Sequence, residues 1–264
     1  MTAVIDLQKA FGALAQTVDC EVEVASCVAQ LIDHETDERA IIARLDELVV
    51  GLKHAGVDSV EALLASLLKH GLGTATLRQA QLRHSHIGWV LAHHEGLPIT
   101  LAVVLIQCAR RLNLTSHGIN FPGHFLVQIE QQYIDPLGMT VVDPAQLLGR
   151  NITVNQLSRM MQPASAQALG LRMLNNVKAV LAARQDWPAA LDVVDCQLAL
   201  AGADPTEVIS SLQFEKGELW ERIGAHKMAR QAYEACLRSS VDAALTQRAQ
   251  ARIEALAGRQ DTLH

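Results

Sequence analysis

The sequence predicts an α+β fold that is predominantly helical, and three observations support this. Apolar residues recur at helical spacing along most of the 264 residues. Half of the residues are hydrophobic but only 3% are aromatic, so aliphatic helix packing must dominate the core. The stretch 96–136 differs, because a long apolar run is followed by short alternating segments that are typical of strands. We therefore expect a small antiparallel sheet beside a buried central helix.

The residues before this stretch predict helices only. Gly56 should end the third of them, and Asp58 with Glu61 three positions later matches a capping box for the fourth. A further helix is expected over residues 84–94, with Trp89 packing against the central helix. The four N-terminal helices are predicted at residues 3–15, 21–32, 37–55 and 60–68.

The central helix is predicted to begin at Pro98. Proline fixes φ and has no N–H, which suits the first turn of a helix. The run from Ile99 to Ala109 is apolar on nearly every face, and periodicity alone would also allow a buried strand. Its length, the leading proline and the pair Arg110 and Arg111 at its end favour a buried helix, since cations stabilise a helix C-terminus.

A β-hairpin is predicted after the central helix. Apolar and polar residues alternate from Phe125 to Glu130, a turn follows at residues 131–132, and residues 133–135 return as a second strand that stops before a proline. His124 would open the first strand and Asp135 would close the second. One imidazole and one carboxylate should therefore meet near the start of the central helix.

Three motifs, GLPITL, NFPGHFLV and IDPLG, occur in an order that resembles the transglutaminase-like, papain-related fold, and more closely its bacterial SirB-type branch. The resemblance covers about residues 82–144. It implies a Gly-x-Cys element opening the central helix, a histidine at the start of one strand and an aspartate at the end of the next. The matching positions are Gly96-Leu97-Pro98, His124 and Asp135.

The nucleophile position of that pattern holds Pro98 instead of cysteine. A cysteine enzyme needs a thiolate that a helix N-terminus and a paired histidine stabilise. Cys108 lies ten residues further along the same helix, about 15 Å away at 1.5 Å per residue, and Thr100 is rotated by about 200° from Pro98. The other four cysteines lie in other segments. We therefore expect no acyl transfer by a Cys–His–Asp triad.

His124 and Asp135 are then either a vestigial pair that makes a structural contact or a surviving acid and base. A metal site built from His86, His93 and His124 is a weaker alternative, because no carboxylate or cysteine has a companion ligand spacing. We predict no metal and no cofactor. Candidate binding residues are Pro98, Thr100, Asn120, Trp220 and Tyr233.

The C-terminal hundred residues predict an all-α region. Gly217, Trp220, Ala229 and Tyr233 have the small–large spacing of a tetratricopeptide repeat, and an earlier helix pair resembles a looser copy. Two repeats are too few for a free-standing array, so they should dock on the first domain. We expect an N-terminal helical segment with a transglutaminase-like domain over residues 1–162, its core at 82–144, and a tetratricopeptide-like domain over 163–264.

The composition limits the kinds of partner and the compartment that we expect for this protein. The net charge is −6 and no basic run occurs, so nucleic acid is not an expected partner. Five scattered cysteines predict neither a disulfide framework nor a structural zinc site, and they fit a reducing cytoplasm. No secretory signal and no apolar window of about 18 residues is evident, so no membrane association is expected.

Two functions stay open at this point. The first is a non-catalytic interaction or regulatory protein that binds another protein or a peptide. The second is a hydrolase or transferase in which His124 activates water and Asp135 orients His124. An open cleft beside His124 would favour the enzyme, and a filled cleft would favour the interaction protein.

Overall fold

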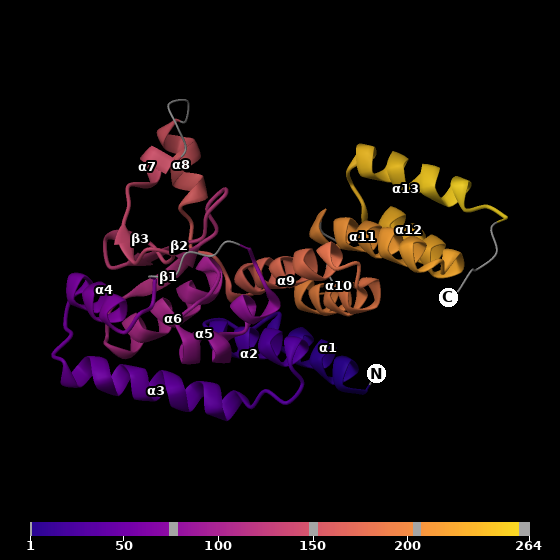
Figure 1. The fold of residues 1–264 in the computed structure, drawn as a ribbon. Coiled ribbons are helices and arrows are strands. Elements are labelled where there is room, and N and C mark those ends of the chain that lie inside the picture. Colours follow the sequence, from indigo (N-terminus) through magenta and orange to yellow (C-terminus); the bar gives the residue numbers. More distant parts are fainter. Residues whose placement is uncertain (1, 74–78, 148–152, 203–206, 259–264) are drawn as a thin grey trace. The chain divides into compact units, whose positions relative to one another are not determined.

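The structure, a computed structural model, describes residues 2–73, 79–147, 153–202 and 207–258 (Figure 1). This part of the chain is mostly helical and contains one four-stranded antiparallel sheet, which confirms the predicted α+β class. The chain forms two compact units. We call Thr17–Met173 the sheet domain, and Met1–Gln16 together with Leu174–His264 the helical domain.

These units differ from the division expected between residues 162 and 163. The residues directly after position 162 still belong to the sheet domain. Pro163 forms a β-bridge with Ile119, and the Ala164 N–H donates to the Gly118 carbonyl. The first sixteen residues belong to the helical domain, where α1 (Thr2–Leu14) packs against α10 (Trp187–Ala201).

The sheet domain is built around α6 (Pro98–Arg111), which begins at its proline as predicted. Every residue from Ile99 to Ala109 is buried, since α2, α3 and α5 pack against it together with strands β1 and β2. The other helices are α2 (Glu21–Ile32), α3 (Glu38–His54), α4 (Val60–Lys69), the 3₁₀ turn η1 (Leu82–Ser85), α5 (Ile87–His93), α7 (Pro144–Leu147) and α8 (Val154–Met160).

The sheet has the order β1-β2-β3-β4, with every neighbouring pair antiparallel. The predicted hairpin is present, but its turn lies at residues 130–131, where Glu130 has a positive φ of 51°. The strands are β1 (Ser116–Ile119), β2 (Leu126–Ile129), β3 (Gln132–Asp135) and β4 (Thr140–Val141).

β1 was not predicted, because its sequence Ser-His-Gly-Ile has little strand preference. Gly118 is needed there for packing. A Cβ at that position would lie 2.6 Å from the ring of Phe125, which is buried at the entrance to β2. The glycine therefore lets the Phe125 ring pass against the neighbouring strand, a close approach that strand glycines commonly permit.

Two helix starts also differ from expectation. The N-cap of α4 is Ser59, whose hydroxyl accepts from the Ala62 N–H, so the capping role given to Asp58 was wrong. The helix expected over residues 84–94 is split by His86, which has extended backbone angles and caps α5 by accepting from the Trp89 N–H. The side chain of a polar residue with extended backbone angles can accept a hydrogen bond from the first N–H groups of a helix. The two helices therefore begin directly after Ser59 and His86.

A buried ion pair joins two ends of the sheet domain. Arg110, at the C-terminus of α6, donates two hydrogen bonds of 2.8 and 2.9 Å to Glu21 at the start of α2. Its Nε also donates to the carbonyl of Ser116 in β1. The Glu21 side chain is only 5% exposed, so its charge depends on this bidentate partner.

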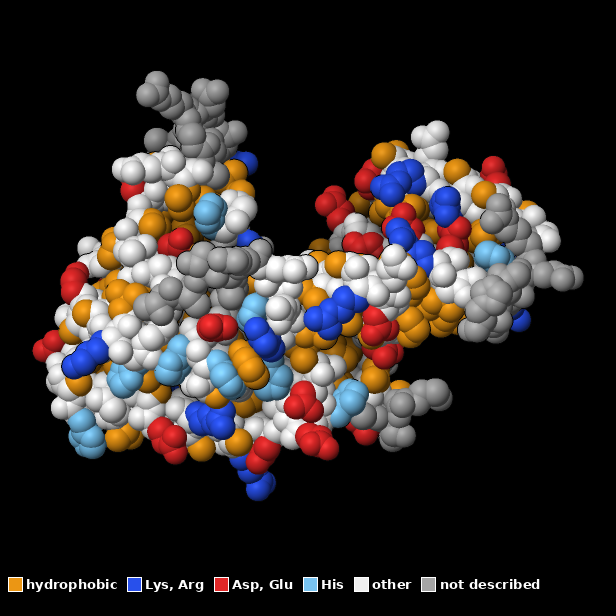
Figure 2. Space-filling model, viewed as in Figure 1, with side chains coloured by type: hydrophobic (Ala, Val, Ile, Leu, Met, Phe, Trp, Pro, Cys, Tyr) orange, Lys and Arg blue, Asp and Glu red, His pale blue; other side chains and the backbone are white. Residues whose placement is uncertain are grey.

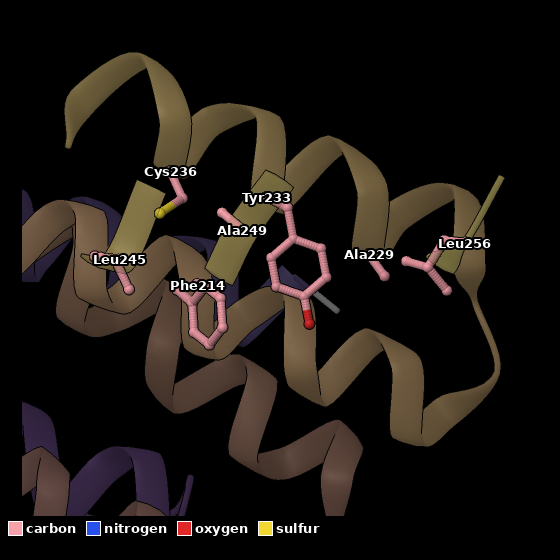
Figure 3. Close-up of a cluster of buried hydrophobic side chains, with 7 residues drawn as sticks. All are labelled: Phe214, Ala229, Tyr233, Cys236, Leu245, Ala249 and Leu256. Carbon is pink, nitrogen blue, oxygen red and sulfur yellow. The ribbon is translucent and has the colours of Figure 1, made fainter. Parts of the chain in front are cut away.

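The helical domain contains α1, α9 (Ala166–Ala183) from Leu174 onward, α10, α11 (Glu207–Ile223), α12 (His226–Ser239) and α13 (Ala243–Ala255). Helices α10 to α13 contact one another in sequence order. Its last three helices share a core (Figure 3), in which the Tyr233 ring lies 5.2 Å from that of Phe214. The cluster consists of Phe214, Ala229, Tyr233, Cys236, Leu245, Ala249 and Leu256.

Within the described ranges, no single helix is both long and apolar enough to cross a membrane. The bent pair α5 and α6, whose axes differ by 78°, reaches the required length and composition only when the two helices are taken together.

Candidate functional site

The position at which the resemblance expects a nucleophile is the first residue of α6. Pro98 is half-buried there and offers no acid or nucleophile. Thr100 is fully buried, and its hydroxyl has no hydrogen-bond partner within the described part of the chain. A buried hydroxyl cannot reach a substrate in solvent, so Thr100 does not replace the missing thiol.

All five cysteines are buried, and none of them forms a disulfide. Burial raises the pKa of the Cys108 thiol to about 12, although Arg111 opposes the shift. Burial also raises the pKa of Cys27 to about 11, and nearby Glu38 adds to the effect. A thiol whose pKa lies this high is almost entirely protonated at neutral pH, and the thiolate is the reactive form. The pKa of these two thiols is therefore raised, whereas a catalytic cysteine needs a lowered pKa.

The expected meeting of His124 with Asp135 does not occur. His124 is exposed and lies two residues before β2. The hairpin register pairs Val127 with Ile134, and extended by one residue it brings Leu126, not His124, opposite Asp135. Asp135 accepts instead from the Leu137 N–H at 2.9 Å, which shapes the turn after β3. No hydrogen bond or ion pair joins the two side chains in the described structure, because the strand starts later than its alternation suggested.

Asn120 is placed by a residue that the sequence did not indicate. Arg172, in α9, donates 2.5 Å to the Asn120 side chain and 3.2 Å to the Phe121 carbonyl, and its guanidinium lies 5.7 Å from the centroid of the Phe125 ring. Burial lowers the pKa of Arg172. This arginine therefore fixes the loop that carries His124, and no local pattern could have linked residues so far apart.

Trp220 and Tyr233 lie in the helical domain. Tyr233 is completely buried, donates from its hydroxyl to Glu221 at 2.5 Å, and has a pKa that burial raises. Trp220 is partly buried and packs against the same core. Tyr233 thus contributes to packing, whereas Trp220 keeps some exposed surface.

A cavity of about 590 Å³ lies between α3 and α5, with the end of α2 and the turn η1 completing its wall. Figure 2 shows arginine or lysine and histidine side chains gathered around hydrophobic ones on the α3 and α5 face of this domain. The apolar part of the lining consists of Ile32, Ala40, Ile41, Leu82, Trp89 and Ala92, and the polar part of Asp33, Thr36, Asp37, Arg44, Arg83, His86 and His93.

Trp89 organises the aromatic side of this cavity. Its ring stacks on His93 with centroids 3.5 Å apart and planes 8° from parallel, and the Arg83 guanidinium lies 5.1 Å from its centroid. Trp89, which we expected to pack against the central helix, therefore lines a cavity. The sequence signal that could have found this site is the spacing of Asp37, Ala40 and Arg44, which fall on one face of α3.

His86 uses both ring nitrogens inside the protein. Nδ1 accepts from the Trp89 N–H, so Nε2 carries the proton and donates to the Thr36 hydroxyl at 2.9 Å. The described residues contain no group of three potential metal ligands, and His124 does not line this cavity. Nothing in the described geometry supports the histidine metal site that the sequence left as an alternative.

The free energy of unfolding should fall as the pH is lowered below about 6.5. Burial lowers the pKa of His86, and those of His84, His94 and His117 shift in the same direction. The unfolded chain therefore binds more protons than the folded one in this range, and protonation favours unfolding. Urea unfolding at about pH 7.5 and about pH 5.5 measures the effect.

The matched variant for this prediction is His86→Asn. Asparagine can still cap α5 but does not titrate. The variant should show a smaller loss of stability on acidification than the wild type. Equal pH dependence of the two proteins would contradict the assignment of this effect to His86.

A central helix that starts at the nucleophile position and packs on an antiparallel sheet is the arrangement of papain-related acyl-transfer domains. Residues 29–175, more than half of the chain, match the family model described as the transglutaminase-like superfamily. The chain belongs to this superfamily.

The chain is similar to several bacterial proteins named UPF0162 protein. One from Xylella fastidiosa strain 9a5c is 32% identical over 136 residues, covering 47% of this chain and 48% of the relative. One from Pseudomonas aeruginosa is 32% identical over 106 residues, covering 39% and 37%, and one from Vibrio cholerae is 24% identical over 162 residues, covering 58% of each. The chain spans about half the length of the curated relatives it matches. No solved structure matches it.

Proposed function

We propose that the protein is a non-catalytic interaction or regulatory protein built on a degenerate transglutaminase-like domain. The observation that carries the proposal is Pro98 at the first position of α6, where the fold would present its nucleophile. The cysteines are all buried, and burial raises the pKa of the Cys108 thiol in the same helix, so none of them supplies a replacement. A domain that keeps the scaffold without the reactive atom retains surfaces that can recognise a partner.

The helical domain supports the binding part of this proposal. Its successive helices α10 to α13 contact their neighbours in order, and Gly217 of α11 receives the ring of Tyr233 from α12. That small–large contact resembles the packing within a tetratricopeptide repeat, a module that commonly binds peptides. The SirB-type assignment and action in the cytoplasm belong to the same proposal.

The hydrolase alternative is less well supported. It needs His124 to act as a base that Asp135 orients within hydrogen-bond reach. His124 is exposed and makes no described hydrogen bond with Asp135, whose carboxylate serves a turn instead. The described geometry thus favours recognition over water activation.

Affinity purification tests the proposal. The tagged chain is expressed at its native level in its own host, cross-linked reversibly, and compared with an unrelated tagged helical protein. We expect a specific protein partner, which then binds the purified chain with a one-to-one or other simple stoichiometry by calorimetry. Recovery of no specific partner, together with turnover of a substrate that His124→Ala abolishes, would overturn the proposal in favour of the hydrolase.

A further inference from the structure

Two guanidinium groups of the α3–α5 cavity have no carboxylate partner in the described structure. Arg44 donates to the Gly88 carbonyl at 3.3 Å, and Arg83 lies against Trp89. Each guanidinium carries five N–H donors, so most of these donors face solvent. Both side chains are exposed and line the same cavity.

The two carboxylates that line the same cavity each accept a hydrogen bond from a backbone N–H group. The Asp33 carboxylate accepts from the Glu35 N–H at 3.1 Å, and the Asp37 carboxylate accepts from the Arg39 N–H at 2.9 Å as the N-cap of α3. Asp37 also lies about two helical turns from Arg44, which is about 10 Å along α3. Both carboxylates keep their charge, but neither forms an ion pair with Arg44 or Arg83 in the described structure, so the two guanidinium groups remain available to an anion.

The space between these groups is apolar. Ala40 and Ile41 come from the same face of α3 as Arg44, and Leu82, Trp89 and Ala92 come from the opposite wall. The volume of about 590 Å³ lies within the range of about 300–1,000 Å³ typical of small-molecule sites. An apolar volume bordered by two guanidinium groups that have no carboxylate partner in the described structure suits a ligand that has an apolar body and an anionic head.

We propose that this cavity binds a small organic anion, with an aromatic or aliphatic body between α3 and α5 and a carboxylate or phosphate monoester head on Arg44 and Arg83. Guanidinium groups recognise both heads through paired N–H donors. The site is separate from the nucleophile position at Pro98, and it gives the proposed regulatory protein a small-molecule ligand in addition to its protein partner.

Calorimetric titration of the full chain tests this proposal with three probes that share one ring system: naphthoate, naphthyl phosphate and the neutral naphthalenemethanol. We expect saturable binding of at least one anion and much weaker binding of the neutral alcohol. The anion that binds more tightly identifies the head group as a carboxylate or a phosphate monoester.

The variants Arg44→Gln and Arg83→Gln should each weaken binding of the preferred anion by about fivefold or more, since each removes a charged hydrogen-bond donor. Arg39→Gln is the matched control, because Arg39 is an exposed residue of the same helix that does not line the cavity. It should leave the dissociation constant unchanged, and all three variants should keep the wild-type circular dichroism spectrum.

Three results would overturn the proposal. These are the absence of saturable binding by either anion, equal affinity for the neutral alcohol, and equal loss of affinity in Arg39→Gln and the two cavity variants.

Discussion

Arg110→Ala is expected to lower the free energy of unfolding of the sheet domain by about 2–4 kcal/mol. The substitution leaves the Glu21 carboxylate buried without its bidentate partner, and it removes the hydrogen bond to the Ser116 carbonyl in β1. An uncompensated buried charge is far more costly than a lost surface pair. Urea unfolding followed by circular dichroism measures the change.

Arg111→Ala is the matched control for this prediction. It removes the next arginine of α6, which pairs with Asp46 at an exposed site, where such pairs contribute about 0–1 kcal/mol. A loss for Arg111→Ala as large as that for Arg110→Ala would contradict the role given to the buried pair.

Gly217→Ala is expected to destabilise the helical domain by about 1–2 kcal/mol, although alanine is the better helix former. A Cβ at this position would lie 2.6 Å from Cζ of Tyr233, whose ring is completely buried (Figure 3). The ring cannot move away without disturbing its contact with Phe214 and its hydrogen bond to Glu221. The tryptophans at positions 187 and 220 report unfolding of this domain by fluorescence.

Gly51→Ala provides the comparison, because Gly51 is an exposed position within α3 and a Cβ there meets nothing within 4 Å. This change should stabilise the protein by about 0.5–1 kcal/mol through helix propensity alone. If Gly217→Ala were also stabilising, the close packing of α11 against α12 would be wrong.

Much of the fold could be predicted from the sequence because its signals are local. Pro98, the apolar run behind it and the arginine pair at its end identify α6 within one turn. The β2–β3 hairpin follows from residue alternation. β1 could not be predicted, since Gly118 is there to admit the Phe125 ring, a requirement that only the folded packing reveals.

The candidate site was harder to predict, because its parts come from distant segments. The resemblance identified the position of Pro98, which the structure places at the start of α6. Alternation alone could not fix the start of β2, and a shift of two residues separates His124 from the place opposite Asp135. Arg44 and Arg83 both line the α3–α5 cavity but lie far apart in the sequence, so no local motif indicates this site.

The most direct test of the central claim, that this transglutaminase-like domain has no activated thiol, is the alkylation of the native protein by iodoacetamide, followed by intact mass. We expect no adduct on the folded wild type, because all five cysteines are buried. The variant Pro98→Cys serves as the positive control, since its new thiol would stand half-exposed at a helix N-terminus. Rapid alkylation of one wild-type cysteine under native conditions, or an acyl adduct on it, would contradict the account.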